Sequence, residues 1–393
     1  MTEVVIASAC RTPVGKYGRS LRAFPAPRLG AIVVRSAVER AHLAPSEVEE
    51  VIMGHVLQAG VGQAPARQAA MLAGIPADVG AVTVNKVCAS GMKAITIGFD
   101  AIRAGHESVV VAGGMESMSQ APYLVKEARW GTGYGSTEFV DAMVHDGLWD
   151  AYNHYHMGIT GENVARRHNI SREDQDLFAL ESHIRALKAT RGGKFRDEIV
   201  PVEISKGEGE ASVVDTDEGV RPDTSLEKLA RLKHVFQEGG TVTAGNASQL
   251  SDGASAVVLM AREAADARGI KPLGRILDYA TSGVLPENVM EAPIPTVHKL
   301  LGKMGLTVDD FDLFEHNEAY AAATVAVMRA LKIPHERMNV HGGAVALGHP
   351  IGCSGARIVT TILHAMKDRG ARRGLATLCL GGGNAMALAL ERL

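Results

Sequence analysis

The fold is decided by one stretch of the chain, Asn85 to Ala94, with the sequence NKVCASGMKA. Residues 80–84 before it, GAVTV, are apolar and typical of a buried β-strand. Apolar side chains after it recur at helical spacing and predict a helix over residues 91–103. The sequence therefore places Cys88 at a turn that leads from a strand into a helix.

A cysteine at such a turn is a candidate nucleophile. Backbone N–H groups at the start of a helix favour negative charge, so we expect them to lower the pKa of Cys88 and raise its thiolate fraction. A single cysteine is more often a buried structural residue than a reactive one. Other segments of the chain must therefore decide between the two interpretations.

Length and composition narrow the classes of protein. The chain has 393 residues, which is long for a single core and predicts two or three domains. Its formal net charge of −3 gives no support to a nucleic-acid or membrane-surface role. No apolar stretch approaches the ~18 residues of a membrane span, and the start of the chain lacks the pattern of a signal peptide.

The cysteines are few and scattered, at positions 10, 88, 353 and 379, and none forms a CxxC pair. That spacing argues against a zinc ribbon or a thioredoxin-type redox motif. It fits a reducing compartment, so we expect a cytoplasmic protein. No ligand set for a metal is visible, and none is expected.

Strands and helices alternate along the chain, which predicts an α/β architecture around a largely parallel sheet. The first half is expected over residues 1–118, completed by about 246–270. Residues 119–245 contain both tryptophans and charged, glycine-containing connections, and are expected to form an inserted loop lobe. Residues 271–393 repeat the pattern. The segment 88–91, a helix and the strand 109–114 have a counterpart in segment 352–355, a helix and residues 375–382, which indicates two similar α/β halves.

Four segments stand out together: residues 85–91, HNEAY at 316–320, GGAVALGHPIG at 342–352 and CLGGGNA at 379–385. Taken singly each is weak, because a lone histidine is usually structural and a GGG run after a strand is usually a tight turn. In this order and combination they closely resemble the thiolase family. The resemblance extends from RTPVGK at 11–16 to the final strand and includes GTVTAGNAS at 240–248.

The resemblance implies a layered αβαβα fold and a ping-pong Claisen condensation of two acetyl-CoA to acetoacetyl-CoA, or the reverse thiolysis. Cys88 matches the nucleophile that forms the acyl-enzyme, and His349 matches the base that activates it. Cys379 matches the second cysteine, which moves the α-proton. Asn317 matches the residue that holds an oxyanion-hole water, and the N–H groups of Cys88 and Gly381 match the second hole.

Coenzyme A is expected as substrate and product, without any other cofactor. In the family the inserted lobe contacts it, and the matching positions are Leu148, His156, Arg221, Lys228, Phe236, Ala244 and Ser248. Without the resemblance, Arg221 and Lys228 are better interpreted as part of a solvated helix face. The family also implies self-association as a homodimer or homotetramer.

Some positions depart from the family pattern. Tyr320 stands where a phenylalanine is common, and His316 and Cys353 replace common apolar residues. A Met-Gly pair near the acyl group in the biosynthetic branch falls on Val289 and Met290. Val289 is expected to open space beside the thioester and Met290 to close it, whereas YHMG at 155–158 favours acetoacetyl-CoA.

Alternatives remain open at this point. Within the family, a degradative 3-ketoacyl-CoA thiolase of broader chain length is the nearest rival. A ketoacyl synthase fits less well, because that group lacks the second catalytic cysteine. A non-catalytic CoA-binding protein of the same fold, or a thiol sensor using Cys88 and Cys379, would share the fold but not the activity.

Overall fold

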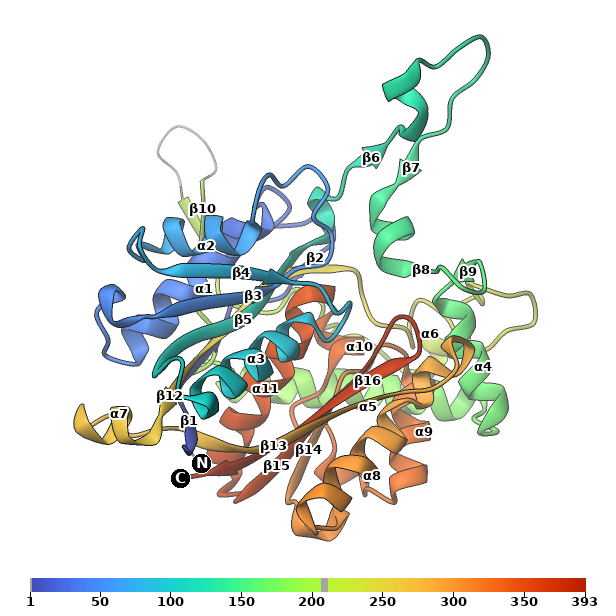
Figure 1. The fold of residues 1–393 in the computed structure, drawn as a ribbon. Coiled ribbons are helices and arrows are strands. Elements are labelled where there is room, and N and C mark those ends of the chain that lie inside the picture. Colours follow the sequence, from blue (N-terminus) through green and yellow to red (C-terminus); the bar gives the residue numbers. More distant parts are fainter. Residues whose placement is uncertain (1, 206–210) are drawn as a thin grey trace.

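The computed structural model describes residues 2–205 and 211–393, and a long twisted sheet runs through its centre (Figure 1). The strand order is β14-β15-β16-β13-β1-β12-β5-β3-β4, with β2 beside β12. The strands of this sheet are β1 (Val4–Arg11), β2 (Gly15–Lys16), β3 (Glu50–Gly54), β4 (Gly80–Val84), β5 (Val109–Ser117), β12 (Ser251–Ala261), β13 (Gly274–Gly283), β14 (Leu313–His316), β15 (Arg373–Leu380) and β16 (Asn384–Arg392).

The sheet consists of two halves that are joined by a short contact. The first half is β4-β3-β5-β12-β1 and the second is β13-β16-β15-β14. They meet only where Val5 and Ile6 of β1 pair with Arg275 and Gly274 of β13. The two halves therefore behave as two packed sheets rather than as one flat layer.

Helices cover both faces of each half. The long helices are α1 (Ala26–Arg40), α2 (Pro65–Ala73), α3 (Ser90–Ala104), α8 (Pro293–Met304), α9 (Ala321–Leu331) and α11 (Ile351–Arg369), with the shorter α7 (Arg262–Ala267) and α10 (Ala344–Leu347). α3 and α11 lie between the two half-sheets, α1 and α2 cover the outside of the first, and α8 and α9 cover the outside of the second (Figure 1). This is the expected αβαβα layering.

Alternating side chains of the strands explain the layers. In β5, Val109 and Val111 pack in the core beneath α1 and α2, whereas Val110 and Ala112 pack in the core around α3 and α11. All four are fully or almost fully buried. Successive strand residues point to opposite faces, so a continuous apolar run is needed wherever helices cover both faces.

Two expectations about the sheet were wrong. Only the neighbours β3 and β4, β3 and β5, and β14 and β15 are parallel along this path, so the sheet is mixed rather than largely parallel. The reason is that β15 and β16 form a tight hairpin and β12 returns antiparallel to β5 and β1. β4 is not buried either: it is the edge strand, and Val82 is 40% exposed.

The two central helices cross where each has a glycine. A Cβ on Gly91 of α3 would lie 2.8 Å from the backbone N of Ala356, and one on Gly355 of α11 would lie 2.5 Å from the backbone N of Met92. Such separations are shorter than van der Waals contact, so only glycine permits this crossing. Gly91 and Gly355 belong to the two repeated segments. The close helix crossing therefore explains the glycine in each repeat.

Among the described residues, the segment between β5 and β12 contributes no strand to the central sheet. It contains the strand pairs β6 (Tyr123–Leu124) with β7 (Val140–Asp141), β8 (Trp149–Asp150) with β9 (Tyr155–His156) and β10 (Val202–Ser205) with β11 (Ala211–Val214), and the helices α4 (Gly158–Arg167), α5 (Arg172–Arg191) and α6 (Leu226–Ala230). The arm formed by β6, β7 and the residues between them projects away from the body (Figure 1). Short 3₁₀ turns are η1 (Pro45–Glu47), η2 (Met118–Gln120), η3 (Lys126–Trp130), η5 (Pro286–Glu291), η6 (Val308–Asp310) and η7 (His335–Arg337), and η4 (Met143–Leu148) is a π-helical turn.

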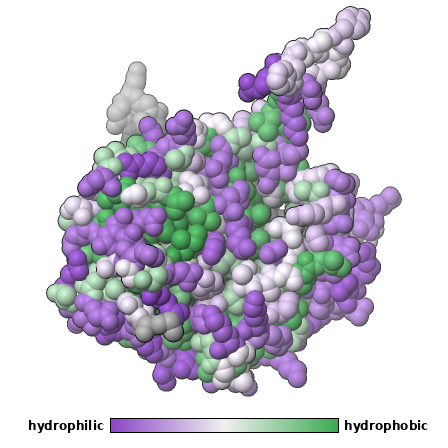
Figure 2. Space-filling view, in the orientation of Figure 1, coloured by the Kyte–Doolittle hydropathy of each residue, from purple (hydrophilic) through white to green (hydrophobic). Residues whose placement is uncertain are grey.

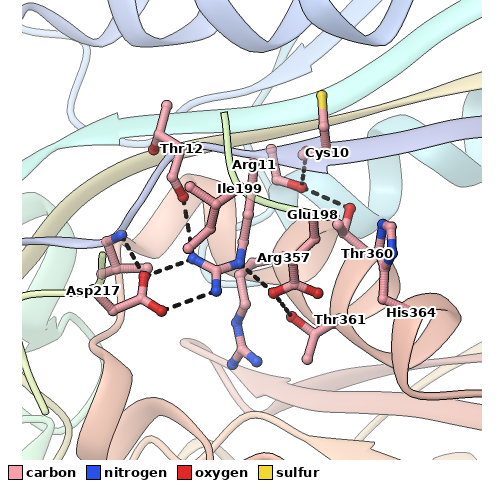
Figure 3. Close-up of polar contacts among 12 residues, drawn as sticks. Cys10, Arg11, Thr12, Glu198, Ile199, Asp217, Arg357, Thr360, Thr361 and His364 are labelled. Atoms are coloured by element: carbon pink, nitrogen blue, oxygen red, sulfur yellow. Dashed lines mark hydrogen bonds and ion pairs between the residues drawn. The ribbon is translucent and has the colours of Figure 1, made fainter. Parts of the chain in front are cut away.

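A buried charge network ties this segment to the sheet (Figure 3). The guanidinium of Arg11 in β1 donates to Asp217 at 2.6 and 2.9 Å and to Glu198 at 2.6 Å. Glu198 also accepts a hydrogen bond from Thr361 of α11 at 3.3 Å. All three charged groups are buried, and a buried charge that loses its partner is strongly destabilising, so the network fixes the path of the segment.

Candidate active site

Four of the predicted catalytic residues lie in loops or at a strand end at one end of the two half-sheets. Cys88 lies in the turn between β4 and α3, His349 precedes α11, Cys379 is near the end of β15, and Gly381 opens the β15–β16 turn. These four residues line one cavity of about 60 Å³, which we call the catalytic chamber. The other lining residues are Val87, Gly147, Leu148, Met157, Ser248, Val289, Met290, Ala319, Tyr320, Ile351 and Leu380.

The turn that presents Cys88 is strained. Val87 has φ = 47°, in the left-handed region that β-branched residues rarely adopt. Ser90 holds it there, because its Oγ accepts from the Lys86 N–H at 2.8 Å and donates to the Val87 carbonyl at 2.6 Å. Such strain persists only where surrounding contacts over-determine the backbone, and it occurs preferentially at functional sites.

The expected low pKa of Cys88 is wrong. Burial raises the pKa of Cys88 to about 12, and the backbone N–H groups of Gly381 and of Cys88 itself act in the opposite direction without prevailing. Burial and the neighbouring Cys88 also raise the pKa of Cys379. Both groups are therefore thiols at neutral pH, and Cys88 needs a base to become a nucleophile. The two N–H groups converge on the Cys88 sulfur, as a hole for an acyl oxygen on it requires.

His349 is held in the form that such a base needs. Its Nδ1 lies 2.6 Å from Ser354 Oγ, and Ser354 Oγ donates its only hydrogen to the Pro350 carbonyl at 2.9 Å. Ser354 must therefore accept the hydrogen bond from Nδ1–H, which leaves Nε2 without a proton. Burial lowers the pKa of His349 to about 3, so the ring is neutral and Nε2 is free to accept a proton.

Asn317 lies beside His349 rather than in the wall of the chamber. Its Nδ2 is 3.4 Å from Nε2 and 3.5 Å from Nδ1 of the ring, longer than an ordinary hydrogen bond. Arg357 Nη2 lies 3.5 Å from Asn317 Oδ1, and Arg357 Nη1 donates to Glu315 at 2.8 Å. This buried pair orients the amide so that its N–H₂ group faces the histidine.

A longer groove of about 470 Å³ leads to the chamber, and the two share Leu148, Ser248, Tyr320, His349 and Ile351. Six predicted coenzyme A positions line the groove, namely Leu148, His156, Arg221, Phe236, Ala244 and Ser248. Within the groove, His156 stacks on Phe236 with ring centroids 4.7 Å apart. Lys228 lies elsewhere: it lines a neighbouring depression of about 100 Å³ and pairs with Asp223 at 2.6 Å.

Several residues of the site escaped prediction. Lys16 and Tyr17 line the groove, and burial together with Arg221 and Arg19 lowers the pKa of Lys16, which marks a cluster of positive charge. Lys16 belongs to the RTPVGK segment, where the resemblance to the thiolase family begins, so that resemblance could have identified it. Ser354 and Arg357 carried a weaker signal, because they lie about one and two helical turns after His349 in sequence.

Val289 and Met290 both line the chamber, as their alignment predicts. Met290 has a further contact: the Cys379 thiol donates to its thioether sulfur at 3.6 Å. In the described part of the chain, no group of three or more histidine, cysteine, aspartate or glutamate side chains is placed to hold a metal ion. None of the described helices has the length and apolar character that a membrane crossing requires.

Comparison with protein families matches almost the whole chain to two domains of one family. Residues 4–263 match the thiolase N-terminal domain and residues 270–392 match the thiolase C-terminal domain. The chain therefore belongs to the thiolase family, a class of acyltransferases.

Similar proteins carry more particular names. Acetyl-CoA acetyltransferases of Pseudomonas aeruginosa and Cupriavidus necator are 51% and 52% identical over 392 residues, covering 100% of this chain and of each relative. A probable acetyl-CoA acyltransferase of Staphylococcus aureus is 49% identical over the same length. The crystal structure of the Bacillus anthracis acetyl-CoA acetyltransferase has a TM-score of 0.98 and 44% identity, covering 100% of this chain and 99% of that one.

Proposed function

We propose that this chain is an acetyl-CoA C-acetyltransferase, which condenses two acetyl-CoA to acetoacetyl-CoA and catalyses the reverse thiolysis. The observation that carries this proposal is the chamber itself, where two thiols meet one neutral imidazole at the end of a long groove. Two thiols allow one to carry the acyl group while the other moves a proton. Coenzyme A enters only as part of the substrates and as a product.

In the first half-reaction, His349 Nε2 takes the proton of Cys88, and the thiolate attacks the carbonyl carbon of acetyl-CoA. The N–H groups of Cys88 and Gly381 stabilise the oxyanion. The S–C bond to coenzyme A then breaks, and the departing thiolate takes the proton from His349. The products are an acetyl thioester on Cys88 and free coenzyme A.

In the second half-reaction, His349 Nε2 first takes the proton of Cys379, and the resulting thiolate removes a proton from the methyl group of a second acetyl-CoA. His349, now protonated on Nε2, donates a hydrogen bond to the enolate oxygen, and Asn317 beside it holds the water that completes this oxyanion hole. The carbanion attacks the acetyl thioester, which forms the new C–C bond and releases Cys88 as a thiolate. Cys379 keeps the proton from acetyl-CoA, the Cys88 thiolate takes the proton that His349 holds, and acetoacetyl-CoA leaves a site with both thiols restored.

The size of the chamber favours short acyl groups over the degradative alternative. A water-sized group takes roughly 10–15 Å³ of such a volume. A chamber of about 60 Å³ therefore has room for about four to six groups of that size. Met290 also packs against Cys379, the residue that handles the α-carbon, and this limits the space for longer chains.

A chain-length series of 3-ketoacyl-CoA thiolysis tests the function. We expect the highest kcat/KM with acetoacetyl-CoA, and a fall with six or more carbons, because each methylene that does not fit costs ~1–3 kcal/mol. A Cys88→Ala variant is the control for non-enzymatic cleavage. A kcat/KM that rises steadily from four to ten carbons would favour the degradative thiolase, and no cleavage of any member would favour a non-catalytic CoA-binding protein.

We also propose that the protein assembles as a homodimer at least, through the edge strand β4. Within the described residues β4 pairs only with β3, so one row of its N–H and C=O groups is unpaired. Hydrophobic side chains gather over this region of the surface (Figure 2), and Met71, Leu72 and Val82 are 40–49% exposed. A cytoplasmic location fits the four cysteines, which are all free thiols.

A further inference from the structure

Tyr320 brings a phenol to the wall of the catalytic chamber. It immediately precedes α9, is only 7% exposed, and lines both the chamber and the groove. Its ring is fixed from two sides. A Cβ on Gly161 would lie 3.0 Å from the ring Cγ, and Phe236 approaches edge-to-face with centroids 6.2 Å apart. The ring therefore cannot turn its hydroxyl elsewhere without moving α4 or Phe236.

The hydroxyl of Tyr320 has no partner in the described part of the chain, although it is not among the fully buried unpaired atoms there. It therefore keeps contact with the open space of the cavity. Burial, followed by the nearby Cys379 and Cys88, raises the pKa of the phenol. The group is protonated at neutral pH, lies close to both reacting sulfurs, and has a hydrogen to donate.

Among the described residues, the rest of the chamber wall supplies no hydrogen-bond partner for the Tyr320 hydroxyl. Among the residues that line it, only Ser248, Tyr320 and His349 carry a side-chain oxygen or nitrogen. His349 is already assigned as the base, and the wall near Tyr320 in the same apolar cluster consists of Met157, Val289, Met290 and Ala319. A hydroxyl facing an apolar wall is unfavourable unless a bound molecule accepts its hydrogen bond.

We propose that Tyr320 selects short acyl groups that carry an oxygen on the carbon next to the reacting carbonyl, of which glycolyl is the smallest. The inference rests on the proposed function and adds a class of acyl donor to it. The small chamber admits one heavy atom more than an acetyl group has. When that atom is a hydroxyl oxygen, Tyr320 Oη donates a hydrogen bond to it. Apolar groups of the same size leave the donor unpaired.

The transfer is the same reaction with a different acyl group. The Cys88 thiol attacks glycolyl-CoA, the S–C bond to coenzyme A breaks, and the thiol proton passes to the departing coenzyme A through His349. The glycolyl thioester on Cys88 then takes up the carbanion of acetyl-CoA. The product is 4-hydroxy-3-ketobutyryl-CoA; Cys379 keeps the proton taken from acetyl-CoA, and Cys88 returns to the thiol with the proton that His349 took from Cys379.

Glycolyl-CoA and propionyl-CoA form a matched pair for the test, because CH₂OH and CH₂CH₃ have the same number of heavy atoms. The second-order rate constant for acylation of Cys88 is measured for each by rapid quench and intact mass. The readout is the glycolyl-to-propionyl ratio of these constants in wild type and in Tyr320→Phe. Comparing the two proteins cancels the different intrinsic reactivity of the two thioesters.

We expect Tyr320→Phe to lower this ratio by about tenfold, the usual effect of one neutral hydrogen bond. Phe keeps the ring that packs on Gly161, and an unchanged circular dichroism spectrum and urea unfolding midpoint check that the variant is folded. Tyr123→Phe, on the projecting arm and 65% exposed, is the control and should leave the ratio unchanged.

A ratio that changes by less than about twofold in Tyr320→Phe overturns the inference, and so does a wild-type enzyme that accepts neither acyl group. In both cases, cleavage of acetoacetyl-CoA by the wild type leaves the proposed function standing. If the wild type neither cleaves acetoacetyl-CoA nor becomes acetylated, the proposed function itself has failed.

Discussion

At the residue scale, the chemistry depends on which proton each group holds before a substrate arrives. Cys88 and Cys379 are thiols because burial disfavours their charged forms. His349 is neutral for the same reason, and Ser354 decides which of its nitrogens carries the hydrogen. The resting site is therefore uncharged, and charge appears only when a substrate carbonyl is present to receive it.

The two cysteines should separate in their half-reactions. Cys379→Ser should still acquire an acetyl group on Cys88 from acetyl-CoA, while condensation falls by ~10²–10⁴-fold, because only the α-proton transfer loses its acid–base group. Intact-mass spectrometry reports the acetylation, and acetoacetyl-CoA formation reports the condensation. Cys88→Ala should lose both, and Cys353→Ala is the matched control that should keep both. Equal loss of both steps in Cys379→Ser would contradict separate roles.

The neutral His349 predicts an unusual pH dependence. Because burial lowers its pKa to about 3, the base form persists well below pH 6.5. The rate of Cys88 acetylation should therefore stay level between pH 8 and pH 5. A histidine with the ordinary pKa of about 6.5 would lose about 30-fold over this range. Rapid-quench measurement of coenzyme A release gives the profile, and an apparent pKa near 6.5 would speak against the buried neutral base.

At the scale of elements, the site is assembled by two repeated strand–helix units. Cys88 lies in the turn just before α3, and His349 lies just before α11. The two helices cross at Gly91 and Gly355, so the approach of their backbones sets the distance between nucleophile and base. Arg357 on α11 also holds Asn317 through its contact with the amide oxygen.

This crossing should be sensitive to one methyl group. In Gly355→Ala the new Cβ would lie 2.5 Å from the Met92 backbone N, so the helices must move apart. We expect a loss of about 1–3 kcal/mol in the free energy of unfolding, with reduced activity. Gly302→Ala in α8 is the control, because no atom lies within 4 Å of its added Cβ, and it should be neutral or stabilising by up to ~1 kcal/mol. Urea unfolding compares them, and equal midpoints would refute the tight crossing.

At the scale of the whole molecule, the two half-sheets, the middle helices and the segment between β5 and β12 enclose one groove and one chamber. The Arg11 network anchors that segment to β1 and α11 (Figure 3). It contributes Leu148, His156 and Phe236 to the groove, so the lining of the groove depends on this anchor. β4 is the last strand of the central sheet, and among the described residues its outer edge is unpaired.

A charge on that edge should prevent assembly. Val82→Lys places a cation on β4, in the region where Met71 and Leu72 of α2 are also exposed, and burying it unpaired would be costly. We expect light scattering to give at least a dimer for the wild type and a smaller species for Val82→Lys. Leu177→Lys, at a site 58% exposed on α5, should leave the mass unchanged. A wild-type monomer, or an unaffected Val82→Lys, would exclude this interface.

The sequence by itself determined the family and the two α/β halves, and it predicted the candidate catalytic residues. Cys88, Cys379 and Gly381 lie at or just after the ends of β4 and β15, and His349 lies just before α11, so all four line one chamber. The division at residues 118, 245 and 271 stays a prediction.

Only the tertiary structure decided the protonation of the site and its surroundings. The pKa of Cys88 rises because the packed chamber outweighs the helix N-terminus, and burial cannot be counted from neighbours in sequence. β4 reads as a buried strand but lies at an edge, because strand order is set by pairing across the fold. Tyr320 differs from phenylalanine by one oxygen. Its place beside two sulfurs, with no partner among the described residues, follows from packing across four distant segments.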